Sequence, residues 1–508
     1  MEPLKVNVFR RDRNGGILFN TMILVMLMVF TSVAFLQWAA DEHMQTDLEL
    51  ARAKAYYVAY YGAIQEGLKY MRTRNASNYN LETVFAEQEV FNPDGKPIGR
   101  YSNVRIREVA YKGEEQGAND FFTSSRQFDL FSTGSVPLNK QYPDGMLRRN
   151  PFPDKVSRTV RLRAKLRTFA NYMYLTNNEV TRFNEIIWFW SPDVLWGRVH
   201  SNDAIGLKFN PTFYGPVSST ADHFVEYSAN PYFAYEPELN APRVGFPDFA
   251  SELRSGAGMQ GNFISDNEGQ LWTRMECGDG GIEFKQWTAG TPWDSTQVIN
   301  SGSIGYGSNR AVFVEGELFL WGDFVSGTIT IGSEGNMNLM DNIKYAEINE
   351  ASPQNPSQDF SDFPHLLGLV SESNIRIQNT WANGRENGAS TNNPDRESIV
   401  ITAAMVALGE SFTFRDQNDT WNTYRFCPGP DERGEIHLRG AVTQERRGYV
   451  HRSNCRGTGY DKDYEYDFRL DYMVPPFYLE ATDEQGNSLF DIVELEELPP
   501  DKNPENLP

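Results

Sequence analysis

The sequence predicts an α+β protein: a long N-terminal transmembrane helix, a small antiparallel sheet, and then a large β domain. An uncharged apolar run near the N-terminus, strands of alternating polarity after it, and many short glycine-bounded strands further on indicate this class. The 508 residues accommodate two to four domains. The expected division is 1–16 basic cytoplasmic leader, 17–92 membrane-spanning and extended helix, 93–187 antiparallel β head, 188–478 large β domain with inserted loops at 220–300, and 479–508 hairpin with a disordered acidic tail.

The apolar run covers residues 17–40 and carries no formal charge. Its length exceeds the roughly 20 helical residues that a bilayer core requires. Arginines precede the run and acidic residues follow it, so we expect a cytoplasmic N-terminus, a single pass through the bacterial inner membrane, and a periplasmic or extracellular remainder. A cleaved signal peptide is the alternative. The side chains expected to face lipid or other helices are Ile17, Leu18, Phe19, Met22, Leu24, Leu27, Phe30 and Phe35.

The helical pattern continues beyond the apolar run, as a stripe of apolar or small residues at helical spacing. A helix from Ile17 to Arg74 would be roughly 85 Å long, with half of it in lipid and half outside. We expect the outer half to pack on partner helices through Met44, Leu48, Ala51, Ala55, Ala59, Ile64 and Leu68.

The basic leader, the residues Arg13-Asn14-Gly15-Gly16-Ile17, the apolar helix and the segment Glu49–Ala59 together resemble a type IV pilin-like N-terminus. The likeness is nearest to PilX-type minor pilins and pseudopilins. It implies cleavage by a prepilin peptidase between Gly16 and Ile17, a pilin-like β head, and other pilin-like subunits as partners. Thr21 stands where the family usually has a glutamate, which favours a tip or accessory position over a repeating one.

Strands are predicted in the head at 104–111, 127–133 and 156–169. In the last of these, apolar residues alternate with the row Arg161, Arg163, Lys165 and Arg167, which is typical of a strand with one buried face. We expect the basic row to be a solvated face, or to meet an acidic partner subunit. Segments 477–482 and 488–495 are predicted to form the C-terminal hairpin.

A second resemblance covers roughly residues 185–478. The segments Gly197–Asn202, Gly215–Val217 and Gly459–Leu470 look like the motifs of an uncharacterised β-rich domain of bacterial envelope proteins. Between them, short strands closed by glycine recur from Ala311 to Ala441, which favours a parallel β-helix (solenoid). A sandwich or barrel is the alternative.

The net charge of −21 argues against nucleic acid as a partner. All three cysteines lie on the exported side of the helix, where disulfides form. A Cys427–Cys455 disulfide is expected, with Cys277 left over.

The candidate chemistry lies in a run of acidic residues spaced by two: Asp461, Asp463, Glu465 and Asp467. On a strand these would share one face and form a weak Ca²⁺ site or a catalytic pair. We favour the other interpretation, a capping loop whose carboxylates accept from backbone donors and pair with nearby Lys and Arg side chains. His200 is interpreted as a structural residue, with general base as the alternative. Aromatic patches, including Trp196 and Tyr232, either stack on sugars or belong to the core.

We therefore expect a non-enzymatic structural or assembly component of the cell envelope, with no cofactor unless Ca²⁺ binds. It would resemble a minor pilin or pseudopilus tip and present its β domain for adhesion or filament assembly. Its partners would be membrane lipid, other pilin-like subunits, and a surface glycan or host-cell ligand. The alternative is a membrane-anchored, polysaccharide-active β-helix enzyme, which requires convergent acids and exposed aromatics.

Overall fold

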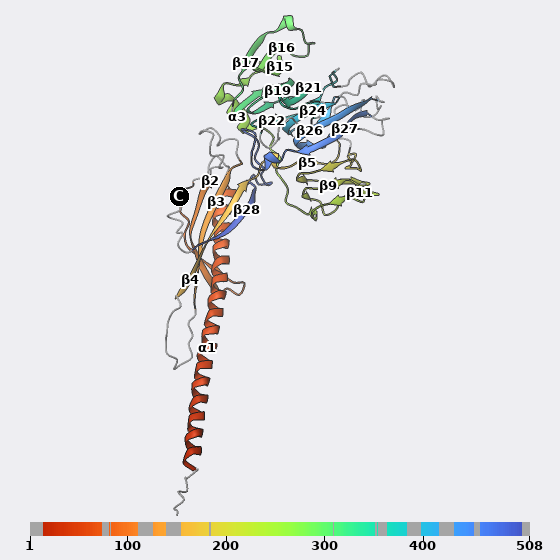
Figure 1. The fold of residues 1–508 in the computed structure, drawn as a ribbon. Coiled ribbons are helices and arrows are strands. Elements are labelled where there is room, and N and C mark those ends of the chain that lie inside the picture. The colour runs from red at the N-terminus through yellow and green to blue at the C-terminus, as the bar shows by residue number, and fades with distance from the viewer. Residues whose placement is uncertain are drawn as a thin grey trace, which may run out of the picture.

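A single helical rod opens the chain, and the large β domain lies at the end of it away from the N-terminus (Figure 1). The computed structural model describes residues 14–73, 81, 83–109, 125–138, 154–181, 184–307, 309–350, 353, 363–380, 382–383, 398–415, 431–451 and 458–499. The rod consists of α1 (Asn14–Gly62), a π-helical turn (Ala63–Leu68) and α2 (Lys69–Arg72). The rod agrees with the helix predicted from Ile17 to Arg74, whereas the expected domain boundary at residue 92 lies too far along the chain, because residues 88–91 already form a strand.

A five-stranded antiparallel sheet wraps the outer half of the rod. Its spatial order is β1 (Gln88–Phe91), β2 (Pro97–Val109), β3 (Gln127–Pro137), β4 (Lys155–Leu166) and β28 (Phe490–Leu498). The rod contacts β2, β3 and β4. Val160, Leu162 and Ala164 of β4 are buried on the side of the sheet that packs on the helix, which is the face that the alternation predicts.

The C-terminal segment forms the expected hairpin only next to its turn, where Thr482 and Ser488 make an antiparallel bridge, and residues 500–508 of the expected tail lie outside the described residues. A turn does form, since the backbone N–H of Asp483 donates to the carbonyl of Asn487 over 2.9 Å. Beyond the turn, β28 pairs with β4 of the head. The head sheet therefore begins near residue 88 and is completed by residues 490–498, and the large β domain is inserted between two of its neighbouring strands. The expected boundaries 93–187 and 479–508 are corrected accordingly.

Charge complementarity explains this pairing. Arg161 lies 2.8 Å from Glu494 and 2.7 Å from Glu496, and Arg158 lies 3.0 Å from Glu497. The basic row of β4 thus meets an acidic partner, as one interpretation proposed, but the partner is the last strand of the same chain. This partner strand could not be predicted from β4 alone, because the periodicity of a strand does not identify which distant segment lies beside it.

The large domain contains two long ladders of parallel strands that pair largely with the next strand but one in the chain. The first, in spatial order, is β13 (Glu238–Leu239), β10 (Val217–Ser219), β7 (Val199–Ser201), β5 (Tyr174–Asn178), β26 (Asp431–Arg446), β24 (Ile399–Ala407), β22 (Leu366–Ser371), β20 (Thr328–Ser333), β18 (Arg310–Val314) and β14 (Phe263–Ile264). The second is β15 (Leu271–Gly278), β19 (Leu318–Val325), β21 (Met337–Tyr345), β23 (Ile375–Ile377) and β25 (Phe412–Phe414). Further pairs join the strands into one closed hydrogen-bonded network.

The segment 220–300, expected to be inserted loops, contains regular structure instead. It holds β11 (Val225–Tyr227), which pairs with β8 (Gly206–Lys208), and β12 (Tyr232–Phe233), which follows β9 (Thr212–Phe213) and β6 (Val194–Leu195). It also holds α3 (Ser251–Gln260) and the antiparallel meander of β15, β16 (Gly281–Thr288) and β17 (Asn300–Ile304). These strands are short or polar, which is why their pattern resembled loops.

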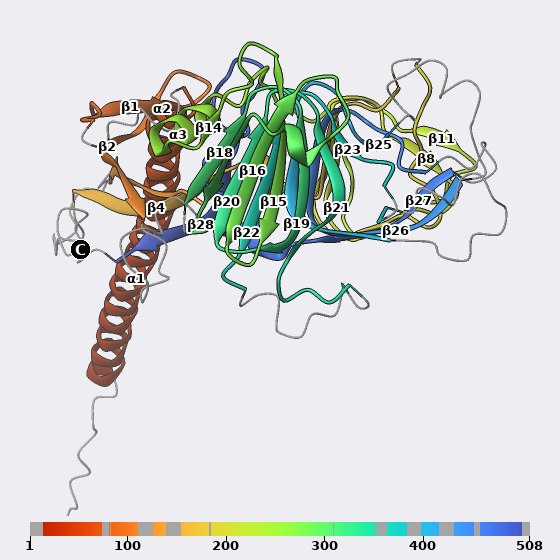
Figure 2. The same cartoon turned by 90° about the horizontal axis from the view of Figure 1, so that it is seen from above.

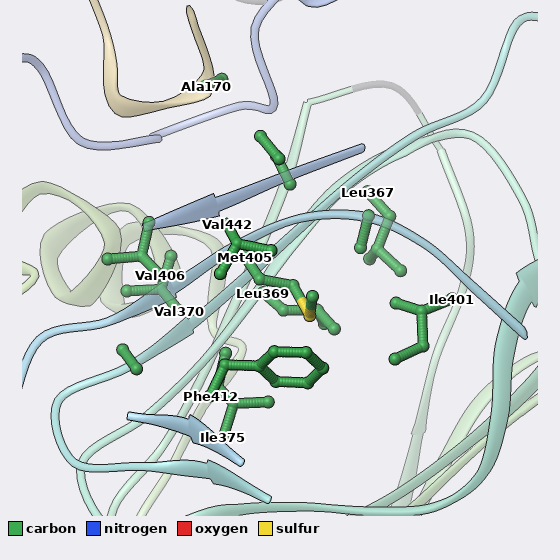
Figure 3. Packing of buried hydrophobic residues seen from close by; sticks show 14 of the residues in the cluster. Ala170, Leu367, Leu369, Val370, Ile375, Ile401, Met405, Val406, Phe412 and Val442 are labelled. Carbon is green, nitrogen blue, oxygen red and sulfur yellow. The ribbon is translucent and has the colours of Figure 1, made fainter. Parts of the chain in front are cut away.

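The core of the large domain lies between the two ladders, where Leu369, Ile375, Ile401 and Met405 meet (Figure 3). Every residue of β24 is buried, as expected of a parallel strand covered on both faces. The C-terminal segment that leads to β28 covers the outer face of the first ladder. The Thr330 hydroxyl donates to the Pro476 carbonyl, and a Cβ at Gly368 would lie 2.9 Å from Pro475. Seen from above, the domain extends to one side of the rod (Figure 2).

Candidate functional site: the exposed and the covered half of the N-terminal helix

The first half of the rod has no covering within the described chain. All eight side chains predicted to face lipid are exposed, by between 54% and 76%. Gly16–Arg72 is the one helix in the described residues that is long and apolar enough to cross a membrane. Each Leu, Ile, Phe or Val in such a segment favours the bilayer by roughly 0.3–0.6 kcal/mol. The site is therefore an apolar surface that requires lipid or other apolar helices around it.

The hydroxyl groups in this half are satisfied within the helix. Thr21 Oγ1 donates to the Ile17 carbonyl over 3.0 Å, and Thr31 and Ser32 bond carbonyls in the preceding turn in the same way. This matters because an unpaired hydroxyl in hydrocarbon costs several kcal/mol.

The second half of the rod packs on its own sheet. Met44, Ala51, Ala55, Ala59 and Leu68 are all at most 5% exposed and lie against β2, β3 and β4, with Leu48 and Ile64 partly buried beside them. This stripe was expected to meet partner helices, and here the structure corrects the expectation. Helical periodicity identifies a face that must be buried, but it does not say what buries it.

Glycine allows the helix and sheet to approach closely. A Cβ on Gly134 of β3 would lie 2.1 Å from the Ala55 carbonyl oxygen and 2.4 Å from the Ala59 nitrogen. Both neighbours are backbone atoms, so neither can rotate away. Gly62 makes the converse approach, since its Cβ would meet Ser132 and Tyr101 within 2.8 Å. The outer half of the rod is thus fixed to the head along its length.

A different stripe of the outer half is not covered by any of the residues that the structure describes. Leu50, Tyr57 and Tyr61 are 52%, 66% and 45% exposed, and their spacing of seven and four places them on one helical face. The sequence carried this signal, but the stronger small-residue stripe on the opposite side obscured it. This face continues outward from the lipid-facing half, and its side chains are exposed in the described chain.

The acidic run does not form one cluster. Asp463 accepts from His437 Nδ1 over 2.7 Å, Glu465 pairs with Arg439, and Asp467 lies 2.6 Å from Arg469. Asp467 stands beyond β27 (Thr458–Tyr466), where it is buried and caps a 3₁₀ turn. The four carboxylates therefore do not act as one face. Glu465 and Asp467 pair with nearby arginines, as the favoured interpretation predicted, and Asp463 pairs with a histidine.

His200 is a buried structural link. Its Nδ1 lies 2.8 Å from Ser218 Oγ and its Nε2 lies 3.1 Å from Asn202 Oδ1. Asn202 in turn donates to the Val244 carbonyl and accepts from the Val244 nitrogen. Burial lowers the pKa of His200 to about 4, so the imidazole is neutral at pH 7. The motif Gly197–Asn202 thus ties the first strands of the large domain to the segment at 244.

The aromatic patches divide between surface and interior. Trp196, Tyr214 and Tyr232 form an exposed row in which the Trp196 and Tyr214 rings stack at 4.1 Å, whereas Phe213 lies in the core and Phe233 packs against it. Cys427 and Cys455 lie outside the described residues. Cys277 is buried and unpaired, and burial raises its pKa to about 12.

Comparison with known proteins adds little. No family model and no curated protein matches the chain. Among solved structures, it is similar to the competence-associated pilin ComZ from Thermus thermophilus, at 10% identity over 88% of this chain and 98% of that one. The TM-score is 0.25, so the likeness establishes neither a common fold nor a function.

Proposed function

We propose that this protein is a non-enzymatic, pilin-like component of the bacterial cell envelope, held in the inner membrane by residues 17–40 with its N-terminus in the cytoplasm. One observation carries the proposal. A single rod is exposed and apolar in its first half and fixed to its own β head in its second half. Because the two halves form one continuous helix, the lipid or the bundle of similar helices that surrounds the apolar half also determines where the head lies.

The proposal extends to assembly. Cleavage after Gly16 frees Ile17 as the new N-terminus, and the apolar half then moves from lipid into a bundle of pilin-like helices. The exposed Leu50–Tyr61 stripe contacts neighbouring subunits. Thr21, without the carboxylate usual in this family, suits a minor, PilX-type or pseudopilus-tip position, with the large domain presented outward for adhesion to a surface glycan or cell ligand.

We further propose that residues 174–446 form a parallel β-helix. The support is the pairing of successive strands with the next strand but one, always in parallel within the two ladders. Polar side chains also stack from rung to rung: Asn374 donates to Asn336 over 3.0 Å, and Asn336 donates to Glu317 over 3.0 Å. Such stacking is expected of coils laid one on another.

Two experiments test the assembly proposal. Mass spectrometry of the protein from its native host should find Ile17 at the N-terminus, and a Gly16→Glu variant should retain its leader. A photo-crosslinking residue at Tyr57 should then capture a pilin-like subunit, whereas the same residue at Tyr235, 59% exposed on the β domain, should not. An intact leader together with no crosslink at Tyr57 would contradict the proposal.

The exposed aromatic row favours a second candidate, a membrane-anchored polysaccharide-active enzyme. This candidate requires two carboxylates that flank a glycosidic bond, one of them acting as general acid. Asp463→Asn should then abolish glycan cleavage without lowering thermal stability. Full activity of that variant would remove Asp463 from the reaction, and no cleavage by the wild type would remove the candidate.

A further inference from the structure

Two neighbouring strands near the end of the large domain place four ligand-type side chains together. β26 and β27 are parallel, and their register sets Glu435 opposite Asp461 and His437 opposite Asp463. Because alternate residues of a strand share a face, all four side chains project on the same side. The group is compact: Glu435, His437 and Asp463 each offer a ligand atom within 4.8 Å of the others.

The two nitrogens of His437 have different surroundings. Nδ1 lies 2.7 Å from Asp463 Oδ2, so in the neutral imidazole it carries the proton and donates. The lone pair is then on Nε2, which lies 3.6 Å from Glu435 Oε2. Two acceptors therefore face each other at a distance too long for a hydrogen bond.

The separation fits two ligands of one metal ion. Atoms held at about 2.1 Å from a tetrahedral ion lie about 3.4 Å apart, close to the 3.6 Å between Nε2 and Oε2. The Asp463–His437 bond supplies the orienting carboxylate that accompanies most metal-binding histidines.

The charge distribution also calls for a cation. One rung further on, Glu465 is neutralised by Arg439. In the part of the chain that the structure describes, Glu435 and Asp461 have no Arg or Lys partner, although they face each other directly. Like charges in that position destabilise a sheet, and a divalent ion between them reverses the effect.

We propose that His437 Nε2 and Glu435 bind a divalent transition metal, with Asp463 as the residue that positions His437 and Asp461 as a further negative charge on the same face of the two strands. The imidazole nitrogen favours Zn²⁺ or a similar ion over Ca²⁺, which takes oxygen ligands. This site differs from the Ca²⁺ site expected at Asp461–Asp467, because of that run only Asp463 belongs to the compact group with Glu435 and His437. The proposal does not depend on the proposed role in assembly.

The test is calorimetric titration of the full chain, purified in detergent and treated with chelator, with ZnCl₂ and separately with CaCl₂. We expect the wild type to bind Zn²⁺ and His437→Ala not to bind it. Asp463→Asn should weaken the affinity for Zn²⁺ by 10- to 100-fold. The control His223→Ala, at an exposed histidine beside Asp222, should leave that affinity unchanged. Glu435→Gln, at a 54% exposed side chain, should weaken Zn²⁺ binding without unfolding and serves if His437→Ala fails to fold.

Three results would overturn the proposal: no heat of Zn²⁺ binding to the wild type, equal Zn²⁺ affinity in folded wild type and His437→Ala, or Ca²⁺ binding that matches Zn²⁺ and survives the loss of His437.

Discussion

Gly134→Ala should loosen the outer half of the rod from the head. The added Cβ would lie 2.1 Å from the Ala55 carbonyl oxygen and 2.4 Å from the Ala59 nitrogen, so the helix must shift rather than a side chain rotate. Overpacking of this kind costs typically 1–3 kcal/mol, and two backbone contacts place the cost near the upper end. We expect the local opening free energy of the helix to fall by about 2–3 kcal/mol.

Hydrogen–deuterium exchange measures this directly. A loss of about 2–3 kcal/mol corresponds to roughly 30- to 150-fold faster exchange of the amides between residues 52 and 68. The matched control is Gly278→Ala in β15, where the added Cβ meets nothing within 4 Å. Exchange in Gly134→Ala as slow as in the wild type would refute the close helix–sheet contact.

Three further predictions follow from burial and charge. The pKa of His200 is about 4 in the folded chain and about 6.5 in the unfolded chain, so the unfolded chain binds more protons between these pH values. The free energy of unfolding should therefore fall by about 3 kcal/mol as the pH drops from 6.5 to 4. In urea titrations, His200→Gln should not show this fall, and a pH profile identical to that of the wild type would contradict a buried, neutral His200. Arg447→Met leaves the fully buried Glu179 carboxylate without its cation and should lower the free energy of unfolding by about 3–5 kcal/mol. The control Arg100→Met, at an exposed ion pair, should lower it by less than about 1 kcal/mol. Equal losses of stability in urea titrations of the two variants would argue against a buried Arg447–Glu179 pair. Arg161→Glu should speed amide hydrogen exchange in β28, because the new carboxylate repels Glu494 and Glu496. When both of these glutamates are also changed to arginine, exchange should slow to the wild-type rate. Exchange that stays fast would mean that charge does not hold β28 against β4.

Patterns local in sequence were predicted well. Glycine-bounded apolar runs indicated β18, β20, β22 and β24, because a strand buried on both faces is continuously apolar. The alternation in β4 likewise indicated which of its residues are buried. In both cases the signal depends only on the residues of the strand itself.

Pairing between distant segments was not predictable from those patterns. A strand at 488–495 was predicted, but β28 is charged and mostly exposed, so nothing in its residues indicates that it pairs with β4 and completes a sheet begun at residue 88. The proximity of His437 to Asp463 depends on the register of β26 and β27, and the residues of the two strands do not encode that register. The covered stripe of the rod was identified, but its partner was not, because periodicity is silent about the opposing surface.

Thiol labelling in intact membrane vesicles is the most direct test of the division of the rod into a lipid-facing and a head-bound half. Single cysteines would replace Leu27, Met44 and Tyr57 in a chain whose three native cysteines are changed to serine. We expect a water-soluble maleimide to label position 57 rapidly, position 44 only after unfolding, and position 27 only after the membrane is dissolved. Rapid labelling of position 27 in intact vesicles, or of position 44 in the folded protein, would contradict this division.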